Sequence, residues 1–154
     1  MRGVAGLIRE AAERHPENAA IIIGTREVPY GGLLGMASGV CSYLREAGHR
    51  PGDRVLLLWE NGPEYAALLF GVLLAGGVVV PLNPKNYTEY VRYIATHSEA
   101  RFVAASDRAF RYLDGWWRGA PVITGLANRE GTVDIGELLR PPAGTHGTRE
   151  AGRN

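Results

Sequence analysis

Histidines and carboxylates have the widest chemical range in this 154-residue sequence, because both types transfer protons and bind metal ions. Such chemistry needs at least two of these groups at close spacing. The histidines are far apart, at His15, His49, His97 and His146. The carboxylates considered are Asp53, Glu60, Glu64 and Asp107, and no two have a spacing that indicates general acid and base roles. The sequence therefore predicts no catalytic residue and no metal site, and His97 is placed in the last turn of a helix.

Other residue types that could bind a ligand are interpreted structurally. Neither G-x-G-x-x-G nor the P-loop pattern occurs, and Gly144–Thr148 has no strand before it and no helix after it. Trp116 and Trp117 could stack on a ligand, but adjacent indoles on a helix point about 100° apart, which favours packing. Cys41 is the only cysteine and lies in an apolar-periodic stretch, so we interpret it as a core residue. Without a disulfide partner, it favours a reduced cytoplasmic setting.

The charge balance excludes two classes of partner. Seventeen basic and sixteen acidic residues give a net charge of +1, which predicts neither nucleic-acid binding nor attraction to an anionic membrane surface. Tyr65–Leu82 is uncharged and approaches the length of a membrane-spanning helix. Gly76, Gly77 and the β-branched Val78–Val80 instead indicate a helix, a turn and a buried strand. Residues 1–12 lack the pattern of a secretory signal, so we expect neither export nor a membrane partner.

Apolar periodicity predicts the elements that would position these residues. The spacing of Val4, Leu7, Ile8, Ala11 and Ala12 predicts an amphipathic helix with one face to bury. Runs at residues 19–23 and 27–30 predict a hairpin around Gly24 and Thr25. The other predicted helices span 32–47, 63–74, a segment capped by Asn86 and ending near His97, 108–117 and 135–139. The other predicted strands are residues 55–59, 78–82, 102–105 and 121–124.

The order of these elements predicts the fold class. Strands alternate with helices from residue 54 onward, which favours an α/β fold with a mostly parallel sheet flanked by helices. A chain of 154 residues suits one such unit. Beyond Arg140 no apolar residue is larger than alanine, so residues 140–154 are predicted to be a disordered tail.

Three segments carry a resemblance to a known family. They are VPYGGLL at residues 28–34, RPGDRVLLLWENGPEYAALLFGVLLAGGVVVPLNP at 50–84, and YIATHSEARFVAAS at 93–106. In this order they resemble the N-terminal segment of the AMP-forming, adenylate-forming superfamily, which includes acyl-CoA synthetases, AMP-dependent synthetases and ligases, luciferases and peptide-synthetase adenylation domains. The resemblance covers residues 4–139 and implies an incomplete N-terminal subdomain. Two departures are Gly31–Gly32 after Tyr30, and Leu74 where the family often has lysine.

The resemblance also implies an activity for a full-length relative, which would use ATP, magnesium and CoA to convert a carboxylate into an acyl-CoA. The phosphate loop ending in Pro-Lys-Gly, the later acidic residues and the C-terminal lysine do not occur in this sequence. We therefore expect a truncated N-terminal part of an acyl-CoA synthetase that is inactive alone. The CoA nucleotide contacts that the resemblance implies fall at Lys85 and Arg111, and the alternative is that both are ordinary solvated cations.

Other hypotheses concern partners. A stand-alone binding or interaction module could keep the CoA-nucleotide surface without enzymatic activity. A truncated subdomain is also expected to expose an apolar face that meets the remainder of a synthetase or a second copy. An unrelated flavodoxin-like domain would require a ligand loop at the carboxyl ends of the strands, and no such loop is evident in the sequence.

Overall fold

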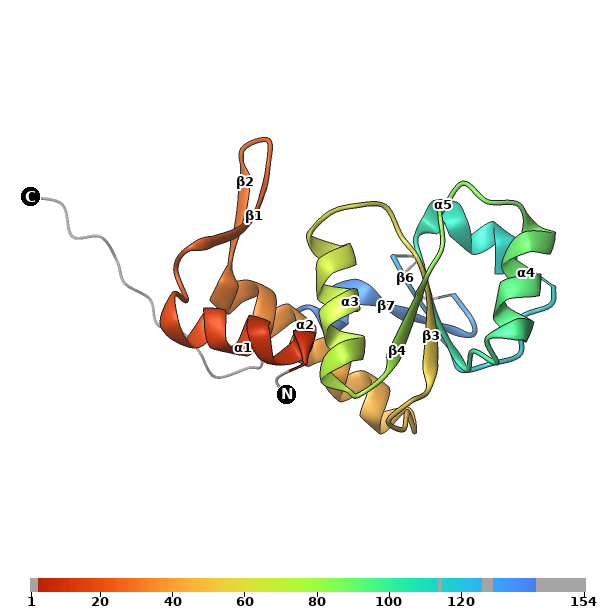
Figure 1. Cartoon of the computed structure of the whole chain (residues 1–154). Helices are drawn as coiled ribbons and strands as arrows, with labels where there is room; N and C mark the ends of the chain where they lie inside the picture. The colour runs from red at the N-terminus through yellow and green to blue at the C-terminus, as the bar shows by residue number, and fades with distance from the viewer. Residues whose placement is uncertain (1–2, 114, 126–128, 141–154) are drawn as a thin grey trace, which may run out of the picture.

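The computed structural model describes residues 3–113, 115–125 and 129–140, and in it strands alternate with helices from residue 26 to residue 124 (Figure 1). The helices are α1 (Val4–Arg14), α2 (Tyr30–Glu46), α3 (Pro63–Leu74), α4 (Thr88–His97), α5 (Asp107–Phe110), the 3₁₀ turn η1 (Arg111–Leu113) and α6 (Ile135–Leu138). The strands are β1 (Ala19–Ile23), β2 (Arg26–Pro29), β3 (Arg54–Leu58), β4 (Val78–Pro81), β5 (Phe102–Ala105), β6 (Val122–Thr124) and β7 (Thr132–Asp134).

Five strands form a parallel sheet in the order β4-β3-β5-β6-β7, which confirms the α/β prediction. The register places Leu56 of β3 between Val80 of β4 and Val103 of β5. Strand β7 was not predicted, because its three residues are half-buried and carry no apolar run. The short β6 and the final helix turn α6 were predicted correctly.

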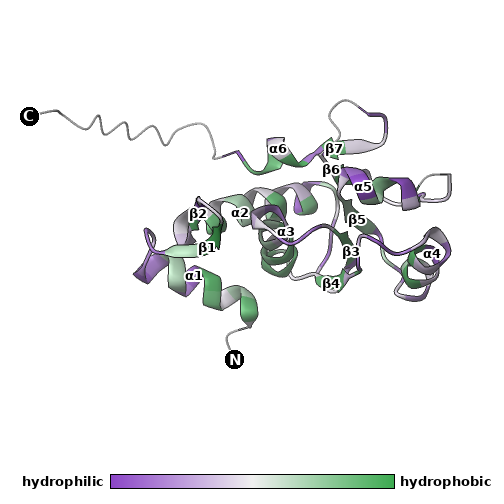
Figure 2. Cartoon of the chain, turned by 90° about the horizontal axis from the view of Figure 1, so that it is seen from above, coloured by the Kyte–Doolittle hydropathy of each residue, from purple (hydrophilic) through white to green (hydrophobic). Residues whose placement is uncertain are grey.

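Both faces of β3 are covered, which explains its uninterrupted apolar run. Val55 and Leu57 pack into a cluster with α2 and α3, whereas Leu56 and Leu58 pack into a second cluster with α4, α5 and η1. Figure 2 shows the hydrophobic character of β3 and α3 at this centre. The cluster on the α2 side includes Cys41, which is buried as predicted. The strand with no polar face thus lies between two helical layers.

Helices α2 and α3 cross in close contact, and the crossing depends on a glycine. A Cβ added at Gly71 would lie 2.5 Å from the Cβ of Val40 and 2.9 Å from the carbonyl oxygen of Ala37. Real Cβ atoms essentially never approach this closely, so a side chain at position 71 would push the two helices apart. Gly35, also on α2, has no such neighbour within 4 Å.

The predicted hairpin forms a separate antiparallel sheet of β1 and β2 that extends from the body (Figure 1). Gly24 occupies its turn with φ of 58°, a left-handed conformation that suits glycine. A small cluster of buried residues holds the hairpin and α1 against the body, namely Ile8, Val28, Leu33 and Ala67. Arg26 adds an ion pair to Glu64 at the start of α3, with an N–O distance of 3.2 Å.

The uncharged run of residues 65–82 folds as helix α3, a turn and strand β4, as predicted. Gly76 in the turn has φ of 79°. Across the described ranges, the structure contains no helix with both the length and the apolar character needed to cross a membrane.

One prediction about burial was wrong, and another is confirmed only in part. Strand β4 was expected to be buried, but it is an edge strand with a neighbour on one side only. Its first residue, Val78, is 47% exposed. The apolar face of α1 is buried only at Ile8 and Ala12, while Val4 and Leu7 are exposed. Strand order and the partners of α1 are set by tertiary packing, which apolar periodicity does not specify.

Two predictions about helix ends were also wrong. The residue that precedes α4 in the cap position is Tyr87, and no side-chain cap is formed, so Asn86 does not cap this helix. The predicted helix over 108–117 is shorter, because α5 and η1 together end at Leu113. The first of these two helices, α5, is capped by Ser106, whose side chain accepts a hydrogen bond from the backbone N–H of Ala109 at 3.4 Å. His97 does lie in the last turn of α4.

Ion pairs join the amino ends of β3 and β5. The Asp53 carboxylate accepts a hydrogen bond from the Arg50 backbone N–H at 2.8 Å and pairs with the Arg101 guanidinium at 2.9 Å. These two interactions hold the pKa of Asp53 below its ordinary value. Arg54 pairs with Glu99 at 2.7 Å, and Glu99 is the one described non-glycine residue with a positive φ, 54°. The two ion pairs therefore tie the entry of β3 to the entry of β5.

Candidate functional site

The carboxyl edge of the sheet contains the crevice that open parallel sheets offer to ligands. From β3 the chain passes through α3 to β4 on one side, and then through α4 to β5 on the other side of β3. Ligands of such sheets bind outside the strand ends where the connections diverge, which here lies between β3 and β5. Numbered from β3, the strand order is also that of flavodoxin-like sheets.

Two hollows lie along this edge and share residues Trp59 and Glu60, which follow β3. The first, of about 440 Å³, lies toward β4 and is lined by Trp59, Glu60, Asn61, Tyr65, Pro81, Leu82, Asn83 and Pro84. The second, also about 440 Å³, lies toward β5 and β6 and is lined by Trp59, Glu60, Ser106, Asp107, Arg108 and Gly125. The carboxylate of Glu60 therefore borders both.

A hydrogen bond joins the ends of β3 and β5 in the second hollow. The Ser106 hydroxyl donates to Glu60 Oε1 at 3.0 Å, and Ser106 itself is buried. Because a carboxylate can accept several hydrogen bonds, this contact leaves Glu60 Oε2 with its full accepting capacity. It also fixes the direction of the Glu60 side chain across the crevice.

A similar contact joins β5 and β6. The hydroxyl of the fully buried Thr124 donates to Asp107 Oδ1 at 3.3 Å. Gly125 makes room for this carboxylate, since a Cβ there would lie 2.8 Å from the same oxygen. Two carboxylates, each oriented by a hydroxyl from the adjacent strand end, thus border the second hollow beside Arg108.

The two hydroxyl–carboxylate contacts define what this edge of the sheet can do chemically. Ser106 donates to a carboxylate, and no described histidine lines either hollow to act as its base. In residues 3–113, 115–125 and 129–140, no group of three or more His, Cys, Asp and Glu side chains is arranged to hold a metal ion. The free carboxylate oxygens can instead accept hydrogen bonds from the donors of a ligand.

Lys85 and Arg111 both follow strands that end at this edge, although neither lines the two hollows described above. Lys85 lies exposed in the loop after β4, where its backbone N–H donates to Asn83 Oδ1 at 2.9 Å. Arg111 lies exposed in η1 after β5, where its guanidinium donates to the Tyr112 hydroxyl at 3.0 Å and lies over the Tyr112 ring. The planar guanidinium has five N–H donors, so contact with Tyr112 leaves donors for a second acceptor.

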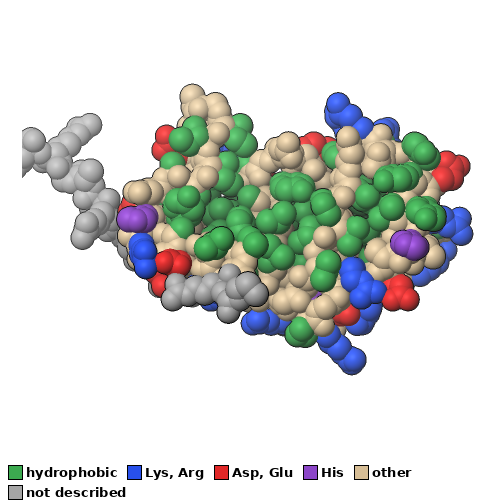
Figure 3. Space-filling view, in the orientation of Figure 1, with side chains coloured by type: hydrophobic (Ala, Val, Ile, Leu, Met, Phe, Trp, Pro, Cys, Tyr) green, Lys and Arg blue, Asp and Glu red, His purple; other side chains and the backbone are tan. Residues whose placement is uncertain are grey.

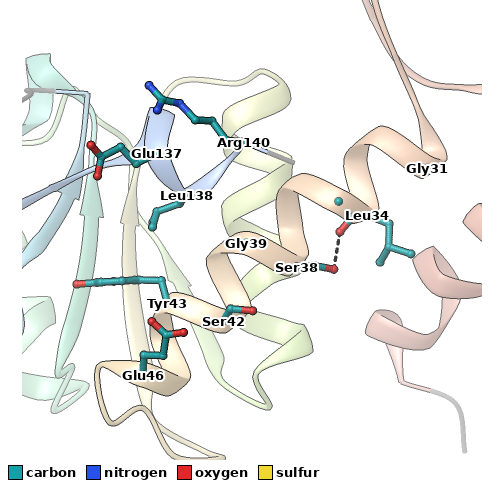
Figure 4. Close-up of a pocket in the computed structure, with 11 residues that line it drawn as sticks. Gly31, Leu34, Ser38, Gly39, Ser42, Tyr43, Glu46, Glu137, Leu138 and Arg140 are labelled. Carbon is teal, nitrogen blue, oxygen red and sulfur yellow. Dashed lines mark hydrogen bonds between the residues drawn. The ribbon is translucent and has the colours of Figure 1, made fainter. Parts of the chain in front are cut away.

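A larger hollow lies elsewhere, between α2 and α6, with a volume of about 660 Å³ (Figure 4). Small side chains of α2 line it, and the Ser38 hydroxyl donates to the Leu34 carbonyl at 2.7 Å. Figure 4 shows the carboxylates of Glu46 and Glu137 well apart. Burial raises the pKa of Tyr43 above its ordinary value, which keeps its hydroxyl protonated. The side chains around this hollow do not form paired hydroxyl–carboxylate contacts like those at the carboxyl edge of the sheet.

Other residues that could take part in chemistry are packed within the fold. Trp116 and Trp117 pack together at 6.0 Å, and their indole N–H groups donate to the backbone carbonyls of Tyr112 and Ala120, at 2.6 and 2.9 Å. Packing was therefore the correct interpretation. His49 is buried against Phe102 at 5.2 Å, and neither of its ring nitrogens has a hydrogen-bond partner among the described residues. His146 and Gly144–Thr148 lie outside the described residues, as does the predicted tail beyond Arg140.

The sequence analysis did not identify Ser106 and Thr124 as the residues that orient the carboxylates of Glu60 and Asp107. Ser106 and Glu60 are 46 positions apart, so their contact depends on the strand order. A usable signal was present, since Glu60, Ser106 and Gly125 each follow a predicted parallel strand within two residues. Parallel strand ends meet at one edge, and polar residues directly after them are therefore candidates for a common site.

Comparison with known families identifies the chain. The family described as AMP-binding enzyme matches residues 8–137, most of the sequence. This chain belongs to the AMP-binding enzyme family. Its fold is accordingly that of the N-terminal subdomain of adenylate-forming enzymes, and an unrelated flavodoxin-like domain is excluded.

Relatives in the AMP-binding enzyme family include both synthetases and ligases. N-(5-amino-5-carboxypentanoyl)-L-cysteinyl-D-valine synthase from Penicillium rubens is 31% identical over 102 residues, or 66% of this chain and 3% of the relative. A benzoate CoA ligase from Burkholderia xenovorans matches 94% of this chain and 30% of the ligase, with 27% identity and a TM-score of 0.76. Coronafacic acid ligase from Pectobacterium brasiliense shares the fold, with a TM-score of 0.80 at 19% identity over 89% of this chain and 29% of the ligase.

The chain spans less than a third of each of these AMP-binding relatives. The match to the benzoate CoA ligase covers 94% of this chain but 30% of the ligase. Family membership therefore describes the fold of the described residues, and the activity of the larger relatives is a separate question.

Proposed function

We propose that this chain supplies the N-terminal α/β layer of an AMP-forming acyl-CoA synthetase. In the proposed reaction a carboxylate oxygen attacks the α-phosphorus of ATP, pyrophosphate leaves, and the acyl group then passes from AMP to the CoA thiol. The likeness to a benzoate CoA ligase carries this proposal, because it combines 27% identity with a TM-score of 0.76 over 94% of the chain. The relatives that are peptide synthetases support adenylate formation in general.

The chain's own residues support a scaffold role within that reaction. The carboxylates at the carboxyl edge have no paired nucleophile and base, and the sequence has no phosphate loop ending in Pro-Lys-Gly. Its single lysine, Lys85, lies in the loop after β4. The proposal therefore assigns adenylate formation to residues beyond these 154, with this layer holding the sheet against which they act.

Assays of AMP and pyrophosphate release test this division of roles. The purified chain would be mixed with ATP, magnesium, CoA and a panel of carboxylates that includes benzoate, anthranilate and fatty acids. We expect release at the no-enzyme background, while the benzoate CoA ligase of Burkholderia xenovorans serves as the active control. Carboxylate-dependent AMP release by the chain alone, above that background, would contradict the proposal.

A second candidate function is a binding surface for the CoA nucleotide, and the position of two cations favours it. Lys85 and Arg111 are exposed and follow two parallel strands at the same edge of the sheet. Phosphate groups bind well to such cations, and the arginine fork can bind one in a bidentate manner. This function would not require adenylation activity, so it stands independently of the first proposal.

Calorimetric titration with CoA tests this surface. We expect micromolar binding that weakens about tenfold in Arg111→Ala, which is equivalent to the loss of one charge-assisted contact. Arg118→Ala is the matched control, because Arg118 is also exposed but its guanidinium donates to the carbonyls of Trp117 and Gly115. Absence of heat with CoA, or equal weakening in both variants, would rule the surface out.

A further inference from the structure

The two hollows at the carboxyl edge of the sheet differ in charge. We call the one toward β4 the β4-side hollow, and its lining residues are Trp59, Glu60, Asn61, Tyr65, Pro81, Leu82, Asn83 and Pro84. Glu60 is the only charged residue among them, whereas the lining of the neighbouring hollow also includes Asp107 and Arg108. The lining of the β4-side hollow therefore presents one negative charge and no positive one.

The charge of the Glu60 carboxylate is not balanced by an ion pair within the residues that the structure describes. Its contact is with the Ser106 hydroxyl at 3.0 Å, which is neutral and leaves Oε2 free to accept hydrogen bonds. The same contact fixes the direction of the side chain, so the charge keeps a defined position at the hollow. An anionic group placed beside it is repelled, whereas a cationic group is attracted.

Aromatic and aliphatic side chains form most of the remaining lining. Trp59 directly precedes Glu60, and Tyr65 lies in the first turn of α3; both are partly buried and pack against the core cluster on the α2 side. Figure 3 shows hydrophobic side chains gathered over α3 and β4, the two elements that flank the hollow. The faces of aromatic rings attract cations, and an apolar lining favours a ligand with an apolar body.

We propose that the β4-side hollow binds an organic ammonium ion with an aromatic or aliphatic body. The ammonium N–H groups donate to Glu60 Oε2, and the body of the ligand lies against Trp59 and Tyr65. A volume of about 440 Å³ is within the range of small-molecule sites. Carboxylates, ATP and CoA are all anionic, so this ligand belongs to a different class and its binding does not depend on the proposed synthetase function.

The exposure of Glu60 sets the strength of binding. Because its side chain is exposed, water screens the ion pair, and the aromatic contacts add only a modest attraction. NMR titration of the nitrogen-15-labelled chain with phenethylammonium therefore tests the proposal. The backbone amides of Trp59, Asn61, Tyr65 and Leu82 should shift and saturate, with a dissociation constant on the order of 1 mM.

Two probes of similar shape isolate the contribution of the ligand's charge. Phenethyl alcohol has a hydroxyl in place of the ammonium group and should bind at least about fivefold more weakly, because it forms no charge-assisted hydrogen bond with Glu60. Phenylacetate carries the opposite charge and should produce no saturating shift at the same amides.

Glu60→Gln isolates the contribution of the protein's charge. Glutamine has the same length, and its carbonyl oxygen can still accept from the Ser106 hydroxyl, so folding should persist, and circular dichroism checks it. Affinity for phenethylammonium should fall at least about fivefold. Glu89→Gln is the matched control, because Glu89 is also exposed but lies on α4 and lines neither hollow; this variant should bind as the parent does.

Several outcomes of these titrations would overturn the proposal. One is the absence of saturating shifts with phenethylammonium across the millimolar range. Equal affinity for phenethyl alcohol would show that the hollow selects only an apolar body. Unchanged affinity in Glu60→Gln, or equal weakening in Glu89→Gln, would show that the carboxylate at this hollow is not the partner of the ammonium group.

Discussion

Replacement of Gly71 by alanine is expected to lower the free energy of unfolding by about 1–3 kcal/mol, and replacement by valine by more. The reason lies at the crossing of α2 and α3, where an added Cβ would lie 2.5 Å from the Cβ of Val40. The same Cβ would lie 2.9 Å from the backbone carbonyl oxygen of Ala37. Because a backbone atom is in the way, a change of the Val40 rotamer alone does not make room. The helices must separate, and the core cluster between them and the sheet loosens.

Gly35→Ala provides the matched control, because Gly35 lies within α2 but nothing approaches its missing Cβ within 4 Å. This change should raise stability by roughly 0.5–1 kcal/mol, since alanine has the higher helix propensity. Urea denaturation of both variants beside the parent chain measures the two effects. A Gly71→Ala variant as stable as the parent would show that the helices are not in close contact.

The second large effect is expected at the centre of the sheet. Leu56→Ala should lower the free energy of unfolding by about 2–5 kcal/mol, because Leu56 is fully buried and its loss leaves a cavity. Its neighbours in register are Val80 and Val103, and it packs within the buried cluster on the α4 side of the sheet, so the site has little freedom to collapse.

Val78→Ala on the neighbouring strand β4 tests the same sheet at its edge. Val78 is 47% exposed, so its truncation should change stability by no more than about 0.5 kcal/mol. Thermal and urea unfolding of the pair would compare centre and edge directly. Equal losses in the two variants would indicate that β4 is covered in solution, as its apolar sequence had suggested.

The sequence predicted individual elements well because each has a local cause. Pro63 begins α3, Gly48 follows α2 with φ of 85°, and the unbroken apolar run of β3 indicates a strand covered on both faces. The position of a strand within the sheet has no such local cause. The run Val78–Val80 has the composition of a central strand, yet the chain places it at the edge.

The candidate site was less predictable than the fold. Glu60 was considered in the search for a carboxylate pair, but its partner proved to be the Ser106 hydroxyl, 46 positions away. Asp107 likewise meets Thr124 of another strand. These contacts depend on β3, β5 and β6 lying side by side, so spacing along the chain could not reveal them. A search of the residues directly after each predicted strand would have been the better method.

The segment that carried most of the family resemblance has a structural meaning. Residues 73–84 form the end of α3, the turn and β4. A Cβ at Gly77 in that turn would lie 2.6 Å from Nε2 of the buried His49, so the turn needs glycine there. This motif therefore specifies how a helix returns to the sheet, and it indicates ancestry more directly than activity.

The separate pairing of β1 with β2 has a consequence for how the molecule opens. Within the residues that the structure describes, no backbone pairing links the hairpin to the five-stranded sheet. A small apolar cluster and the Arg26–Glu64 ion pair help to hold it against the body. The hairpin can therefore unfold locally while the sheet stays intact, so its amides should exchange with solvent hydrogen faster than those of β3.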